Sequence, residues 1–209
     1  MANKTYFAEV IESSLQLWTA QSWQWNQGVD FATLVAVEEK NRTVFGLVYH
    51  IETGSWQTGR TPFPYQKTEE ELLRDQPQIF ELLRTSFKCL TLGYKEPAGP
   101  ILYQYAPQPP KIHAFVRPAT DEETAQFFAD DRYIPILFAG NQHFNLEELL
   151  LGLLQFRIKK GLFEPEHCKN FIDTFSLLTG NDYRRLKVFL HRLQPLLESG
   201  HLQKTPQLY

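Results

Sequence analysis

The first half of the chain has the apolar pattern of short β-strands. Four segments concentrate the β-branched and aromatic residues that are enriched in strands: residues 6–12, 15–17, 34–37 and 43–53. The polar residues 39–42 separate the last two and predict a hairpin turn. Gly46 interrupts the longest segment, which indicates a bend, a bulge or a close backbone approach, as where a small barrel turns a corner.

A helical interruption is expected next. Thr68 and Glu71 match a capping box, in which each side chain satisfies a free backbone N–H at the start of a helix. Pro77 predicts a break and the start of a second turn, because proline cannot donate a hydrogen bond inside a helix. Apolar residues then recur at helical spacing as far as Phe87. Strands are expected again over residues 89–95, 101–105 and 112–117, with the proline-rich residues 106–110 as an extended connector.

The apolar period changes to 3.6 residues near Asn145, which is typical of amphipathic helices. Thr120 caps a short helix over residues 121–128 before this point. Three longer helices are predicted from their start and stop signals: Asn145 to Gly161, Pro165 to Gly180, and a third from Asn181. Their short links favour a compact antiparallel bundle. About six strands followed by three helices is an α+β arrangement.

Composition places the protein in the globular class. The chain has 209 residues, of which 43% are hydrophobic and 22% charged, enough for one sizeable domain or a core domain with a small second one. No apolar run approaches the roughly 18 residues of a membrane helix, and residues 1–12 do not resemble a signal peptide. Cys89 and Cys168 form neither a disulfide framework nor a paired metal motif. We expect a cytoplasmic protein without a membrane span.

Positive charge is enriched toward the C-terminus. Residues 146–209 hold nine Lys or Arg and seven acidic residues, a net charge of +2, which leaves −5 for residues 1–145. A basic patch for nucleic acid or for an acidic protein is one interpretation, and a solvated helix face is the other. The residues concerned are Arg157, Lys159, Lys160, Arg184, Arg185 and Lys187.

Motifs of known catalytic chemistry are missing from the sequence. It contains no phosphate-binding loop, dinucleotide fingerprint or Gly-x-Ser-x-Gly elbow. Cys89 with a distant histidine has no local signature of a nucleophilic pair, and Asp130 with Asp131 is more typical of a solvated turn than of a cation site. We therefore assign no catalytic residue and no cofactor.

The six histidines include no helical metal-ligand pair. His50 and His113 lie in predicted strands and could meet inside a barrel, although a hydrogen-bonded barrel histidine is commoner than a metal ligand. His143 lies between a predicted strand and a helix start, where backbone donors could hold an anion. A structural turn is the alternative there, and no metal site is assigned.

Tryptophan is the strongest indication of a binding surface. Trp23 and Trp25 would share one face of an extended segment, because side chains alternate along a strand. Burial in the core is one interpretation. Exposure would mark a partner site, since tryptophan concentrates binding energy at interfaces. With Trp18, these residues are the candidate partner-binding tryptophans.

Three segments together resemble the HAS-barrel family. They are residues 7–12 (Phe-Ala-Glu-Val-Ile-Glu), 44–48 (Val-Phe-Gly-Leu-Val) and 105–110 (Tyr-Ala-Pro-Gln-Pro-Pro), the last followed by Val116. This small six-stranded barrel stands at the N-terminus of HerA-type DNA translocases and of rotary ATP synthase α and β subunits, where it is non-catalytic, helps subunits to form rings and docks partners. The resemblance covers about residues 4–118. The family's P-loop ATPase is replaced here by predicted helices without a Walker motif, so the resemblance implies an assembly or docking module; stand-alone chains of this type are typical of cyanobacteria.

These observations predict an α+β protein with three regions. Residues 1–118 form a small closed six-stranded antiparallel β-barrel with a helical insertion, residues 119–144 a connecting segment, and residues 145–209 a C-terminal three-helix domain. We expect a non-enzymatic protein-interaction or complex-assembly module with a protein partner and the capacity to form oligomers. The alternative is a nucleic-acid-binding accessory factor that uses the basic helix residues. An enzyme or metal protein built on the histidines is the least favoured hypothesis.

Overall fold

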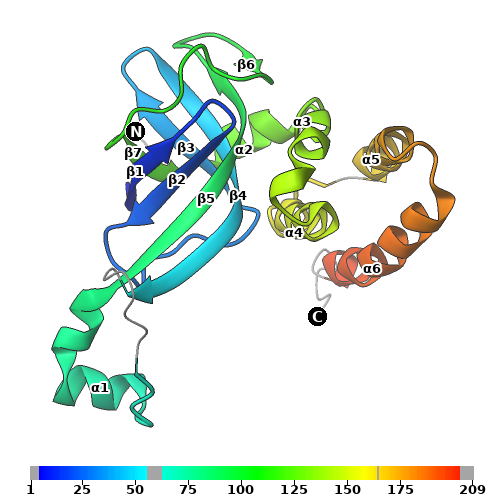
Figure 1. Ribbon diagram of the computed structural model, residues 1–209. Helices are drawn as coiled ribbons and strands as arrows, with labels where there is room; N and C mark the ends of the chain where they lie inside the picture. The colour runs from blue at the N-terminus through cyan, green and yellow to red at the C-terminus, as the bar shows by residue number, and fades with distance from the viewer. Residues whose placement is uncertain (1–4, 56–62, 164, 203–209) are drawn as a thin grey trace, which may run out of the picture.

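A closed β-barrel forms the first half of the protein in a computed structural model (Figure 1), which describes residues 5–55, 63–163 and 165–202. The strands are β1 (Ala8–Ser13), β2 (Leu17–Ser22), β3 (Leu34–Glu39), β4 (Arg42–Ser55), β5 (Leu83–Lys95), β6 (Ile101–Leu102) and β7 (Phe115–Pro118). Six of them follow the order β2-β1-β7-β3-β4-β5, and β5 pairs back with β2 to close the barrel. All pairings are antiparallel, and β6 extends the edge of β5. The predicted α+β class and the closed six-stranded barrel are confirmed.

The helices fall where the capping signals placed most of them. They are α1 (Glu69–Asp75), α2 (Asp121–Phe128), α3 (Ile134–Ala139), α4 (Leu146–Lys159), α5 (Pro165–Leu178) and α6 (Tyr183–Leu202), with 3₁₀ turns η1 (Pro77–Leu82) and η2 (Asn141–His143). The pair α1 and η1 is the predicted insertion between β4 and β5. Thr68 and Thr120 each complete a capping box, and Asn145 accepts a hydrogen bond from the backbone N–H of Glu148.

The barrel has a well-filled interior. Inward-facing side chains alternate with outward-facing ones, so that Val35, Val44, Phe87 and Val116 pack in one cluster around Trp18, which is only 1% exposed. Space for the indole comes from Gly46, where a Cβ atom would lie 2.5 Å from Trp18 Cζ2. The β4–β5 register also shifts beside Gly46, which confirms the predicted bulge.

A second core lies between the barrel wall and the helices. The outward-facing residues of β3, β4 and β5 join buried residues of α2 to α6 in one continuous cluster, in which Leu34, Phe45 and Leu90 contribute from the barrel. Helix α4 lies close to the barrel at Gly152, where an added Cβ atom would lie 2.9 Å from the Phe31 ring. Helices α2 to α6 thus cover one side of the barrel and leave β1, β2 and the start of β7 on the other side (Figure 1).

Several predicted boundaries are wrong. The helical spacing that ran to Phe87 ends at Leu82, because β5 begins at Leu83 and places Phe87 inside the barrel. The segment before His143 is helix α3 and not a strand, since its buried residues Ile134 and Leu137 have helical spacing. The strand expected over residues 112–117 starts at Phe115, and the one over 101–105 ends at Leu102.

None of the described helices is long and apolar enough to cross a membrane.

Candidate functional site

Three aromatic rings lie together on the side of the barrel that the helices leave uncovered. Phe115 occupies the centre, with the ring centroids of Trp23 and Tyr6 at 5.4 and 5.6 Å. Trp23 is 50% exposed and Phe115 47% exposed, whereas most aromatic side chains of the chain's two cores are fully buried. We call Tyr6, Trp23 and Phe115 the aromatic patch.

Polar contacts fix the orientation of the exposed indole. Glu9 lies opposite Phe115 in the β1–β7 pairing, and its Oε1 atom accepts a hydrogen bond of 3.0 Å from Trp23 Nε1. Its Oε2 atom lies 3.2 Å from His113 Nδ1. The backbone N–H of Trp23 also donates to the Phe7 carbonyl at 2.9 Å. The indole is therefore exposed but held in one orientation, so it loses less conformational entropy on binding a partner than a freely rotating side chain would.

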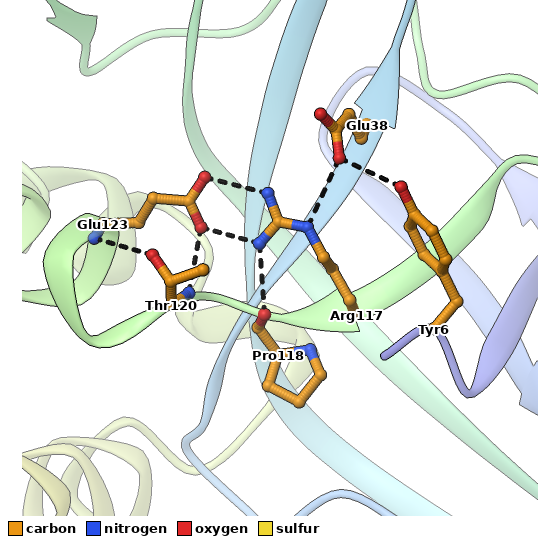
Figure 2. A network of polar contacts seen from close by, with 6 residues as sticks. All are labelled: Tyr6, Glu38, Arg117, Pro118, Thr120 and Glu123. Atoms are coloured by element: carbon orange, nitrogen blue, oxygen red, sulfur yellow. Dashed lines mark hydrogen bonds and ion pairs between the residues drawn. The ribbon is translucent and has the colours of Figure 1, made fainter. Parts of the chain in front are cut away.

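A polar network holds the third ring (Figure 2). The Tyr6 hydroxyl donates to Glu38 Oε2 at 3.0 Å, and the same oxygen lies 3.5 Å from Arg117 Nε. Arg117 in turn makes a bidentate contact with Glu123 at 2.7 and 2.9 Å. This network ties the patch to strands β3 and β7 and to the first turn of α2.

The ion pair between Arg117 and Glu123 in this network is largely shielded from solvent. Arg117 is 1% exposed, and its guanidinium also donates to the Pro118 carbonyl. Burial alone would raise the pKa of Glu123, but hydrogen bonds from Arg117 and from the Thr120 backbone outweigh it and lower the pKa to about 2. Glu123 is therefore ionised at neutral pH, and its oxygens are satisfied within the protein, so it serves as a fixed support and not as a proton donor.

The structure separates the three candidate tryptophans. Strand β2 ends at Ser22, so the segment after it turns and does not place Trp23 and Trp25 on one face as predicted. Trp25 is half-buried and stacks on Phe80 of η1 with centroids 5.2 Å apart, which anchors the insertion. Trp18 fills the barrel interior and offers no surface to a partner, which corrects its assignment as a binding residue.

The predicted basic residues do not form one patch. Lys160 pairs with Asp121 at 2.7 Å, and the Arg185 guanidinium pairs with Glu147. Lys159 and Lys160 end α4, whereas Arg185 contacts its first turn; at about 1.5 Å per residue the two groups lie about 18 Å apart. Lys159, Arg184 and Lys187 are exposed and make no ion pair in the part of the chain that the structure describes.

Arg157 is a structural residue and not a surface cation. It is 0% exposed and lies 3.4 Å from Asp131. It donates 2.8 Å to the Tyr133 hydroxyl and also to the carbonyls of Phe128 and Leu162. These contacts join the segment between α2 and α3 to the turn after α4. Its assignment to a basic binding face is wrong. The guanidinium is buried because it donates the hydrogen bonds that these buried oxygen atoms need.

The candidate chemical residues do not all come together in one site. The side chains of His50 and His113 are 51% and 79% exposed, so they do not meet inside the barrel. His143 lies in η2 and lines a surface groove with His50 and Lys88. Burial raises the pKa of the Cys89 thiol well above its ordinary value, which keeps it protonated and unreactive in the barrel interior. No group of three or more potential metal ligands occurs among the described residues.

Sequence reasoning missed two members of the patch, Tyr6 and Phe115. A signal was present, since Phe115 precedes Val116 in a predicted strand and must face outward if Val116 faces inward.

Comparison of the sequence with protein-family models and with curated proteins gives no match.

Proposed function

We propose that the chain is a non-enzymatic protein-interaction module that docks a partner protein through the aromatic patch. The observation that carries this proposal is a half-exposed Trp23 and Phe115 in contact on a part of the barrel that the helices leave uncovered, with the Trp23 indole hydrogen-bonded to Glu9. Tryptophan and other aromatic side chains dominate the binding energy of protein interfaces, and a pre-oriented ring loses little entropy on binding. The resemblance to the HAS-barrel family, whose barrels dock partners, agrees with this function by analogy.

The geometry favours this proposal over the nucleic-acid alternative. Of the six basic residues considered, Arg157 is buried and Lys160 and Arg185 are paired with acids. A nucleic-acid surface needs several free cations on one face, because its affinity comes from releasing counterions from phosphates. Binding that falls steeply as salt increases would restore the alternative.

The experiment is affinity capture from extracts of the native cell with the whole chain as bait. Trp23→Ala and Phe115→Ala should each weaken capture of a specific partner by about 2 kcal/mol or more, roughly thirtyfold in Kd. Leu177→Ala is the matched control, because Leu177 is 73% exposed but lies on α5, in the helical layer. Equal capture by all four proteins, with circular dichroism showing intact folds, would refute the proposal.

A further inference from the structure

The helical insertion presents acidic and apolar side chains that its own chain does not cover. No residue of α1 or η1 is buried, and Leu73 is 47% exposed. Glu69 and Glu70 form no ion pair within the described residues, unlike Asp75, which Lys67 contacts at 2.8 Å. Spacings of three and four residues place Glu69, Glu70 and Leu73 on one face of α1. We call these three residues the acidic arm. Helix α1, which carries them, projects from the end of the barrel (Figure 1).

Helix α6 presents the complementary combination. A groove of about 400 Å³ lies between the start of α4 and α6, with Phe189 and Val188 among its lining residues and Arg184 beside them. Val188 is 63% exposed, and Arg184 and Lys187 are exposed without an ion pair in the described structure. Arg184, Lys187 and Val188 share one helix face by the same spacings of three and four residues. We call this groove, which Arg184 and Val188 line, together with Lys187 on the same helix face, the basic groove.

The two surfaces are complementary in charge. Each offers two charges of one sign, which make no ion pair among the described residues, beside one exposed aliphatic side chain, and the sign differs between the two surfaces. The arm cannot reach the groove of its own chain, because Trp25 stacks on Phe80 and fixes the insertion at the barrel end, away from α6 (Figure 1). A second copy of the chain satisfies both surfaces.

We propose that this protein self-associates head to tail, with the acidic arm of one copy in the basic groove of the next. The two surfaces differ, so the contact is heterologous and leaves one free arm and one free groove in a dimer. Association therefore continues beyond the dimer, into a closed ring or an open chain. This contact uses neither Trp23 nor Phe115, so it is independent of the proposed partner-docking function.

Charge reversal tests the contact directly. The arm variant Glu69→Lys/Glu70→Lys and the groove variant Arg184→Glu/Lys187→Glu each bring like charges together and should weaken self-association at least about tenfold. In an equimolar mixture the arm of the groove variant meets the groove of the arm variant as in the wild type, and the two reversed surfaces again carry opposite charges. The mixture should therefore associate although neither variant does so alone. Glu96→Lys/Glu122→Lys is the matched control for the arm variant, because these two exposed acids give the same charge change as that variant outside both surfaces.

Sedimentation velocity of the full chain, from about 1 to about 100 μM, provides the measurement. Wild type and control should grow in mass with concentration, and this growth should weaken as salt increases. Leu73→Ser, which leaves every charge in place, should also weaken association. The test of the acidic arm therefore does not depend on the arm variant alone, in which a local loss of the α1 helix would have the same effect. A monomeric wild type at about 100 μM, undiminished association of both reversed variants, or a mixture that stays monomeric would overturn the proposal.

Discussion

At the scale of single residues, the packing of the barrel interior depends on the large side chain of Trp18 and on the absence of a side chain at Gly46. Trp18 of β2 fits in the barrel interior because Gly46 of β4 leaves room for its indole. The sequence predicted that Gly46 marks a bulge or a close approach, and both occur. It could not predict which side chain makes the approach, because Trp18 and Gly46 lie in different strands and meet only when the barrel closes.

Gly46→Ala should destabilise the protein by about 1–3 kcal/mol, because the added Cβ would overlap the Trp18 ring. Gly54→Ala is the control: Gly54 lies in the same strand, and a Cβ atom there meets nothing within 4 Å. Urea denaturation of both variants measures the difference. Equal stability of the two variants would show that the indole does not depend on Gly46.

At the scale of elements, the arrangement of helices follows from strands that are apolar on both faces. In β3 the residues Leu34, Val35, Ala36 and Val37 are all buried, alternately against the helices and inside the barrel. An uninterrupted apolar run of this kind requires cover on its outer face. The sequence therefore contained the information that helices pack on β3, whereas the start of β5 depended on a tertiary contact that local spacing does not encode, since Phe87 fits a helical spacing but packs inside the barrel.

The link between barrel and helices has a titratable element in Glu123. Its pKa is lowered from the ordinary value of 4.5 to about 2, so its contribution to stability is complete above pH 4.5 and is lost as the pH falls toward 2. Glu123→Gln keeps the capping geometry but removes the charge that faces buried Arg117, and should cost about 3 kcal/mol at neutral pH.

Urea denaturation across this pH range distinguishes the two proteins. The difference in unfolding free energy between wild type and Glu123→Gln should be largest above pH 4.5 and should shrink as the pH approaches 2. A difference that stays constant across this window would mean that Glu123 acts through packing or capping and not through its charge.

At the scale of the whole molecule, the helices cover one part of the barrel and leave the aromatic patch uncovered. Under the helices the outer strand residues are buried in a shared core, whereas Trp23 and Phe115 are half exposed. The prediction of a tryptophan-based site identified Trp23 from residue type alone. It could not separate Trp23 from Trp18, because that depends on where β2 ends and which of its faces turns inward.

The most direct measurement is ¹⁹F NMR of protein labelled with 5-fluorotryptophan, titrated with the captured partner and assigned by single Trp→Phe replacements. The Trp23 resonance should shift in proportion to the partner bound, while that of Trp18, enclosed in the barrel, stays unchanged. A partner that binds to saturation and leaves the Trp23 resonance in place would contradict the claim that the uncovered face of the barrel is the recognition surface.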